Sequence, residues 1–153
     1  MSKCILLVDA NVFSSLLHKD DALHRNAKEI FEIISKNNKV KIIVPPIILY
    51  EICTVALKKG IDKKIIKEKT QRIIDWNKVS IVSLSELSIY KHINRTARNH
   101  VREPAIKTND LIILNTALEL DAALVSTDKK LLKSAKRLKV PCCRNSEDLL
   151  GLL

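Results

Sequence analysis

The sequence predicts an α/β protein, a three-layer α/β/α sandwich in which helices cover both faces of a central, mostly parallel sheet. Three observations support this prediction. Short apolar runs are typical of strands buried on both faces, stretches with helical periodicity separate them, and this alternation along the chain favours a parallel sheet. No repeat or linker interrupts the 153 residues, so we expect a single domain over residues 1–153.

The first predicted strand is CILLV, residues 4–8, a continuous apolar run that ends directly before Asp9. Its lack of polar alternation indicates that it is buried on both faces of the sheet. Further strands are expected at residues 41–44, 79–82, 122–126 and 141–143, of which the second and the last have the weaker pattern.

Between these runs, apolar residues recur at intervals of three and four, as on one face of a helix. Asp62, Ser83 and Asn109 are residue types that favour a helix start, and Glu86 follows Ser83 by three residues, as in a capping box. Three stripes result: Ala27, Ile30, Phe31 and Ile34; Ile47, Ile48, Glu51 and Val55; and Ile61, Ile65, Ile66, Ile73 and Ile74.

The composition excludes several classes of enzyme. The chain has two glycines, Gly60 and Gly151, whereas phosphate-binding loops, dinucleotide-binding turns and the nucleophile elbow of hydrolases each need several close together. Lysine and arginine total 27 against 17 acidic residues, a formal charge of +10. Such a charge favours a polyanionic partner, with nucleic acid ahead of an anionic membrane surface.

The cysteines and the hydropathy pattern predict a cytoplasmic protein. Four cysteines show no metal-binding or redox spacing, which favours a reduced, intracellular chain. The apolar run near the N-terminus is too short for a signal peptide, and no run approaches the roughly 20 residues of a membrane span. We expect no membrane association.

Four acidic residues occupy positions at which chemistry is expected. Asp9 and Asp128 follow predicted strands, and ligands of parallel α/β sheets bind at the carboxyl ends of the strands. Either aspartate could instead be a simple helix cap. Glu51 and Asp110 lie on apolar helices, where a carboxylate is costly unless it is paired or binds a metal ion.

If the four carboxylates converge, they need a cation, because they would otherwise repel one another and some would take up a proton. Ligation by oxygen alone suits Mg²⁺ or Mn²⁺ better than Zn²⁺. Such an ion could activate a water molecule and stabilise the charge that develops on a leaving oxygen. The pattern therefore indicates metal-assisted phosphodiester chemistry.

Three segments, in this order, resemble the PIN domain family, which includes the toxins of VapBC toxin–antitoxin pairs. They are VDANVF with Asp9, PPIILYEICTVAL with Glu51, and TNDLIILNTALELDAALVSTD with Asp110 and Asp128, and the likeness extends from near residue 4 to about residue 140. The resemblance implies a metal-dependent endoribonuclease whose acidic residues bind Mg²⁺ or Mn²⁺. It implies a supporting role for Asn11, which would orient Asp9 or a water molecule, and for Ser126. It also implies a homodimer and a small antitoxin partner.

The sequence departs from the family pattern after the last aspartate. Many members carry a second acid two residues later, followed by an aromatic residue, whereas this chain has Lys130 and Leu131. A lysine there would compete electrostatically with a second metal ion. We therefore expect one ion rather than two, with Asp128 as a direct ligand or acting through water.

Basic residues outside the acidic motifs are candidates for contact with RNA. Lysines at 129, 130 and 133 follow Asp128 directly, and three arginines recur at helical spacing between residues 95 and 102. A solvated helix face or pairing with neighbouring acids is the alternative. Tyr50 is expected to point away from Glu51 and receives no role. The predicted RNA-binding residues are Arg95, Arg98, Arg102, Lys129, Lys130 and Lys133.

Three functions remain in competition at this point. An endoribonuclease, as the toxin of a toxin–antitoxin pair, fits the four carboxylates best. A non-catalytic PIN-like module that binds RNA or acts as a scaffold is the alternative, and Lys130 favours it. A phosphoryl-receiver domain would need an acid after the strand at residues 41–44, where Pro45 and Pro46 stand instead.

Overall fold

The computed structural model describes residues 4–82, 86–102 and 106–153. Its five strands form one sheet in the order β3-β2-β1-β4-β5, and all neighbouring strands are parallel. The strands lie at or within two residues of the predicted runs, so the predicted parallel sheet is confirmed. They are β1 (Cys4–Val8), β2 (Val40–Val44), β3 (Val79–Ile81), β4 (Ala123–Val125) and β5 (Cys142–Cys143).

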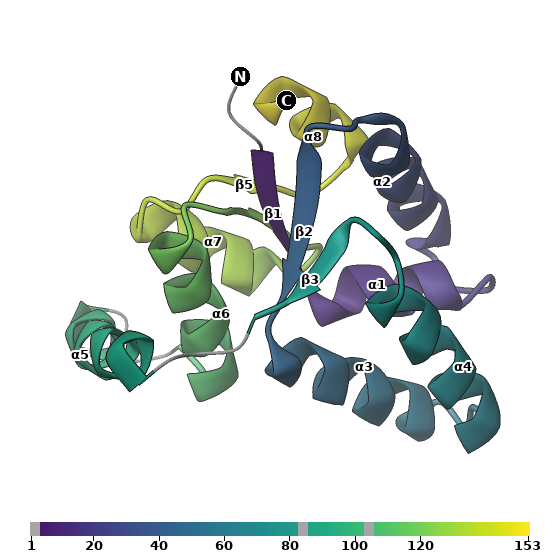
Figure 1. Ribbon diagram of the computed structural model, residues 1–153, viewed down its shortest axis with the longest axis horizontal. Coiled ribbons are helices and arrows are strands. Elements are labelled where there is room, and N and C mark those ends of the chain that lie inside the picture. The colour runs from purple at the N-terminus through teal and green to yellow at the C-terminus, as the bar shows by residue number, and fades with distance from the viewer. Residues whose placement is uncertain (1–3, 83–85, 103–105) are drawn as a thin grey trace.

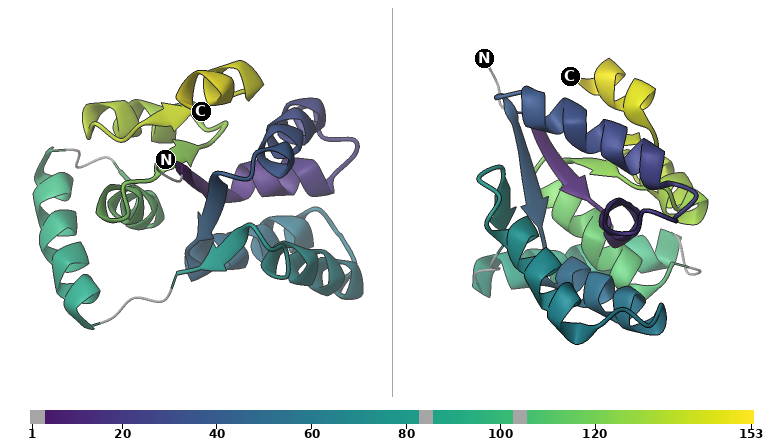
Figure 2. Two further views of the ribbon diagram at one scale, coloured as in Figure 1. Left: turned by 45° about the horizontal axis from the view of Figure 1, so that its top comes forward. Right: turned by 90° about the vertical axis from the view of Figure 1, so that its right-hand side faces the viewer.

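Helices cover both faces of this sheet, which gives the predicted three layers (Figures 1 and 2). On one side lie α1, α2, α3 and α4, with α8 packed against α2; on the other lie α6 and α7, with α5 outside α6. The helices are α1 (Ala10–Leu17), α2 (His24–Lys36), α3 (Pro46–Lys58), α4 (Lys63–Ile74), α5 (Glu86–Arg102), α6 (Thr108–Glu119), α7 (Lys129–Arg137) and α8 (Ser146–Leu152).

The centre of the sheet holds the most deeply buried residues. Strand β1 pairs with β2 on one side and β4 on the other, so that Leu6 lies opposite both Ile42 and Ala123. Leu6, Leu7 and Val8 are fully buried. Because β1 and β4 are neighbours and parallel, the residues that follow them emerge side by side at one edge of the sheet.

The helix stripes were predicted with mixed success. The stripe on α2 faces the core, with Ile30 and Ile34 fully buried. The stripe on α3 is partly wrong, because Ile48 is fully buried whereas Ile47, Glu51 and Val55 are only partly buried. The third stripe is partly wrong, because Ile61 precedes α4 and Ile65 is 44% exposed. Ile66 and Ile73 of the same stripe are buried on α4, as predicted.

The predicted helix starts also differ in outcome. Asp62 caps α4, since its side chain accepts a hydrogen bond from the Lys64 amide at 2.8 Å. Helix α6 begins at Thr108, so that Asn109 lies inside the helix and its side chain is free for another contact. Ser83 lies outside the described residues.

All four cysteines are free thiols. Among the residues that the structure describes, no helix is both long enough and apolar enough to cross a membrane.

Candidate active site

A groove of about 890 Å³ opens at the carboxyl edge of the sheet, where β1 and β4 end. Helix α3 forms one wall, and the N-terminal ends of α6 and α7 contribute to the opposite side. Four acidic side chains predicted from the sequence all line this groove: Asp9, Glu51, Asp110 and Asp128. We call it the acidic groove.

Asp9 is the most deeply buried of the four, with 6% of its surface exposed. Its backbone N–H continues the pairing of β1 with β4 by donating to the Val125 carbonyl at 2.9 Å. One carboxylate oxygen, Oδ1, accepts a hydrogen bond from the Ala10 amide at 2.7 Å and caps α1. The other, Oδ2, accepts from the Ser126 hydroxyl at 2.7 Å. Asp9 is therefore a helix cap and a groove residue at once.

The electrostatic environment of Asp9 disfavours its charge. Burial raises the pKa of Asp9 to about 6, while the hydrogen bonds from Ser126 and Ala10 partly oppose the rise. The negative charges of Glu51 and Asp110 raise this pKa further. A cation in the groove would remove this penalty.

Ser126 connects the residues around Asp9. Its Oγ donates to Asp9 and accepts a hydrogen bond from the Asp128 amide at 3.0 Å. The Asn11 amide group donates to the same oxygen at 3.4 Å, and its own oxygen accepts from the Thr127 amide at 3.5 Å. Asn11 therefore contacts Asp9 through Ser126, whereas the sequence suggested that it would orient Asp9 or a water molecule directly.

Glu51 is held by a contact that the sequence did not predict. Its Oε1 accepts a hydrogen bond from Nδ2 of Asn109 at 2.8 Å, which joins α3 to α6 across the groove. Asn109 had been assigned only as a helix start. The sequence carried one indication of a role in the site: Asn109 directly precedes Asp110 and therefore lies at the helix end that faces the edge of the sheet.

Asp110 is half-buried, and its pKa is raised, chiefly by that burial. The negative charges of Asp128 and Glu51 raise this pKa further, whereas the ammonium group of Lys107 lowers it. The charges of two other acids therefore raise the pKa of Asp110, as they do for Asp9.

Asp128 caps α7, as the simpler alternative predicted. Its Oδ1 accepts hydrogen bonds from the amides of Lys130 at 2.7 Å and Leu131 at 3.2 Å. The side chain of Lys130 is exposed and, among the described residues, is not part of the groove lining. This placement weakens the argument that Lys130 competes with a second metal ion.

The donor chemistry suits a hard divalent cation, because every acidic side chain in the groove offers only oxygen. Within the described ranges, however, no three histidine, cysteine, aspartate or glutamate side chains approach one another closely enough to coordinate an ion as they stand. The fit therefore rests on the oxygen donors and on the raised pKa values of Asp9 and Asp110, which result chiefly from burial and in part from the neighbouring carboxylates.

The lysines that line the acidic groove differ from those predicted to bind RNA. Lys58 and Lys59 come from the end of α3, and Lys107 comes from the start of α6. Lys59 Nζ lies 3.2 Å from Asp21 Oδ2, so that acid balances part of its charge. Neither Lys58 nor Lys107 was among the residues predicted to bind RNA.

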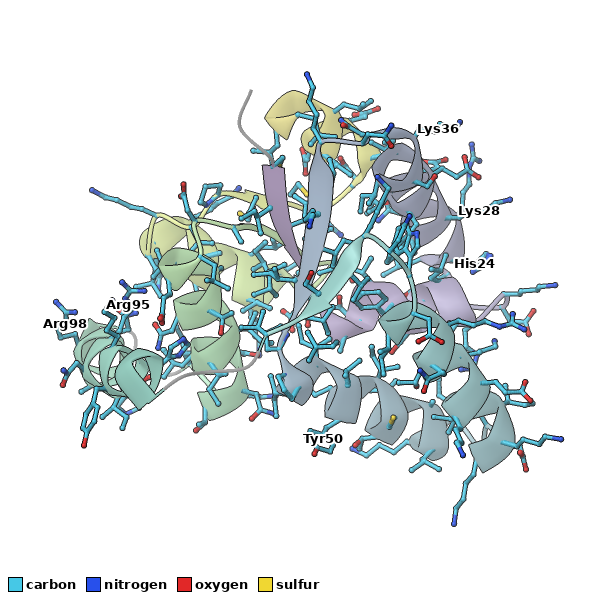
Figure 3. All side chains as sticks on the ribbon, in the orientation of Figure 1. His24, Lys28, Lys36, Tyr50, Arg95 and Arg98 are labelled. Atoms are coloured by element: carbon cyan, nitrogen blue, oxygen red, sulfur yellow. The ribbon has the colours of Figure 1, made fainter. Side chains whose placement is uncertain are left out.

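The predicted RNA-binding residues lie outside the described lining of the groove. Lys129, Lys130 and Lys133 are exposed on α7, beside Asp128. Figure 3 shows Arg95 and Arg98 on α5, which packs outside α6, and Nη1 of Arg95 donates to the Asn115 carbonyl at 3.4 Å. Arg102 ends α5, and its side chain lies outside the described part of the structure.

Tyr50, which received no role from the sequence, also belongs to the lining of the acidic groove. The groove is wide enough that Tyr50 and Glu51, which are adjacent on α3, both belong to its wall. Its ring is 71% exposed and lies on the outer side of α3 (Figure 3).

Comparisons with known proteins agree with this architecture. The sequence model of the PIN domain family matches residues 6–137, while a comparison with curated proteins gave no match. One similar solved structure is VapBC2 from Rickettsia felis bound to a promoter DNA fragment, with a TM-score of 0.68 and 19% identity over 91% of this chain and 97% of the other. Another is VapC20 from Mycobacterium tuberculosis, described as a Sarcin-Ricin loop cleaving toxin, with a TM-score of 0.66 and 15% identity over 85% and 94% of the two chains. At such identities the structural likeness shows the fold, and the family match shows that the chain belongs to the PIN domain family.

Proposed function

We propose that this protein is a metal-dependent endoribonuclease that hydrolyses RNA phosphodiester bonds, and that residues 1–153 act as one catalytic domain. Members of the PIN domain family are typically nucleases. The observation that carries the proposal is the buried carboxylate of Asp9 at the end of β1, whose pKa is raised in a groove that it shares with Glu51, Asp110 and Asp128. Without a bound cation, burial and mutual repulsion make the charged form of these carboxylates unfavourable.

In this proposal, Asp9, Glu51 and Asp110 hold Mg²⁺ or Mn²⁺, and Asp128 contributes directly or through water. When bound, the ion supplies Lewis-acid chemistry, lowering the pKa of a bound water and balancing negative charge on the phosphate. Ser126 and Asn109 fix the carboxylates of Asp9 and Glu51. Such supporting contacts are important because metal affinity depends on how the ligands are oriented.

The protein's own side chains would also place the substrate. Lys58 and Lys107 bring positive charge to the groove and suit the phosphate backbone of RNA.

We further propose that the protein works in the cytoplasm, as the toxin of a toxin–antitoxin pair, and forms a homodimer. Similar structures include a toxin–antitoxin complex from Klebsiella pneumoniae, which supports an antitoxin partner. Leu57 of α3 and Ile65 of α4 are 49% and 44% exposed, and such apolar side chains suit a contact between two copies.

The nuclease proposal is tested by incubating purified protein with single-stranded and structured RNAs in Mn²⁺, Mg²⁺ or EDTA. Asp9→Asn removes the central charge, and Asp20→Asn, at an exposed position outside the groove lining, is the matched control. We expect cleavage by the unmodified protein and by Asp20→Asn, and none with EDTA or with Asp9→Asn. Salt-sensitive RNA binding without cleavage under any condition would instead support a non-catalytic RNA-binding module.

A further inference from the structure

The aromatic residues divide into a buried group and two exposed tyrosines. Phe13, Phe31 and Trp76 pack together, with ring centroids 5.2 Å and 5.8 Å apart. Tyr50 and Tyr90 are the only tyrosines of the chain and are 71% and 69% exposed. Only Tyr50 lines the acidic groove. Packing in the core therefore explains the first three rings and leaves the exposure of Tyr50 unexplained.

Tyr50 lies on a rigid wall beside the acids. The groove face of α3 presents residues at helical spacing: Ile47, Tyr50, Glu51, Thr54, Val55 and Lys58. The opposite face is anchored in the core by Ile48 and Ile52, which are fully buried. Since the helix backbone is fixed, binding a ligand against the Tyr50 ring would order little more than that one side chain.

The charges along this wall match a strand of RNA. Lys58 follows Glu51 by seven residues, which corresponds to about 10 Å along the helix axis. A phosphate near Lys58 would leave a neighbouring base within reach of the aromatic ring, close to the acids. Lys107 adds a second positive charge across the groove.

We propose that Tyr50 is a base-stacking residue that receives an unpaired base next to the phosphate that is cut. This inference rests on the proposed nuclease function and adds a preference within it. Bases in a duplex are already stacked on one another, so only single-stranded or looped RNA can offer a base to the ring. Because every base has an aromatic face, the contact favours unpaired RNA with little regard to sequence.

Binding without metal separates this inference from catalysis. We would measure the anisotropy of a labelled single-stranded RNA and of a matched duplex in EDTA. The proteins are the unmodified chain, Tyr50→Ala, Tyr50→Phe and the equally exposed control Tyr90→Ala. Tyr50→Ala should weaken single-strand binding by between about 5-fold and 100-fold, the range found when a stacking aromatic side chain is removed. Tyr50→Phe, Tyr90→Ala and all duplex binding should change less than about twofold, since none of them affects the stacked ring.

A second experiment identifies the base. We would prepare a series of RNAs, each of which lacks the base at one position. At one position, removal of the base should weaken binding by the unmodified protein but should not weaken binding by Tyr50→Ala any further. Equal losses in both proteins at every position would overturn the proposal, as would equal weakening of single-strand and duplex binding by Tyr50→Ala. A change in sedimentation of Tyr50→Ala without RNA would also overturn it, because the ring would then belong to a contact between copies.

These outcomes are independent of the nuclease test. If the unmodified protein cuts RNA and Tyr50→Ala binds normally, the stacking proposal fails and the nuclease stands. If Tyr50→Ala loses single-strand binding and no protein cuts RNA, the nuclease proposal fails and Tyr50 remains a stacking residue of an RNA-binding protein.

Discussion

The hydroxyl of Ser126 donates a 2.7 Å hydrogen bond to Oδ2 of Asp9, although the two residues are 117 positions apart in the chain. The contact is possible because Asp9 and Ser126 follow the ends of β1 and β4, which are paired and parallel. It fixes the most buried acid of the groove through a side chain that is itself fully buried.

Ser126→Ala should destabilise the protein and raise the pKa of Asp9 above about 6. The substitution removes a hydrogen bond that lowers this pKa and leaves the Asp128 amide without its acceptor, at a cost of about 1–3 kcal/mol. Urea denaturation would measure the loss, and the acid side of the pH–rate profile should move to higher pH. Ser14→Ala is the control, because its buried hydroxyl has no hydrogen-bond partner within the described part of the chain. Equal losses for both variants would contradict the prediction.

In EDTA, Asp9 should make the protein less stable as the pH rises. Its pKa is raised from 3.8 in the unfolded chain to about 6 in the folded protein, so between these values the folded state binds the extra proton. The free energy of unfolding should therefore fall through this window and level off above it, by roughly 3 kcal/mol at about 1.4 kcal/mol per pKa unit. Asp9→Asn cannot ionise at this position, so its free energy of unfolding should not show this fall. Urea denaturation at a series of pH values would measure the free energy of unfolding of both proteins. A parallel pH dependence of the two proteins would contradict the assignment.

Asn109→Ala should weaken metal binding without unfolding the protein. It removes the hydrogen bond that holds Glu51 Oε1, and loss of such a supporting contact typically costs about 10-fold to 100-fold in metal affinity. Calorimetric titration with Mn²⁺ in the absence of RNA would measure it. Asn94→Ala, at an exposed position on α5, should bind Mn²⁺ as the unmodified protein does.

Two substitutions of Asp128 should separate its cap from its charge. Asp128→Asn keeps a side-chain oxygen for the amides of Lys130 and Leu131 and should leave stability almost unchanged, whereas Asp128→Ala should lose about 1 kcal/mol. Both remove the charge, so both should cleave RNA more slowly. If Asp128→Asn cleaves at the unmodified rate, Asp128 is a structural cap with no part in the reaction.

Lys58→Ala should reduce the salt dependence of RNA binding. Each phosphate contact to a single strand contributes about 0.7 to the slope of log affinity against log salt concentration. Lys36→Ala is the control, since Lys36 ends α2 at the opposite edge of the sheet from Tyr50 (Figure 3). Binding titrations at several salt concentrations would show the difference, and equal slopes for the two variants would place the RNA elsewhere.

Local patterns in the sequence were sufficient for the sheet and for the position of Asp9. The apolar run of β1 can be satisfied only by burial on both faces, and Asp9 follows it directly, so its place at the carboxyl edge is a consequence of strand direction. The same reasoning placed Asp128 after β4. Helix periodicity likewise put Glu51 beside buried residues of α3, although it misplaced Ile65, because a helix with several isoleucines has more than one apolar face.

The sequence by itself determined the alternating strands and helices, the parallel sheet and the acidic residues that meet at its edge, because these depend on neighbours within a few positions. Only the tertiary structure decided that Asn109 holds Glu51, that Tyr50 lines the groove and that Lys58, Lys59 and Lys107 line it as well. Those relationships depend on the separation and rotation of α3 and α6, and the packing of both helices with the sheet sets that geometry. No local pattern encodes it, because the contacting residues are far apart in the chain and each has an ordinary alternative role.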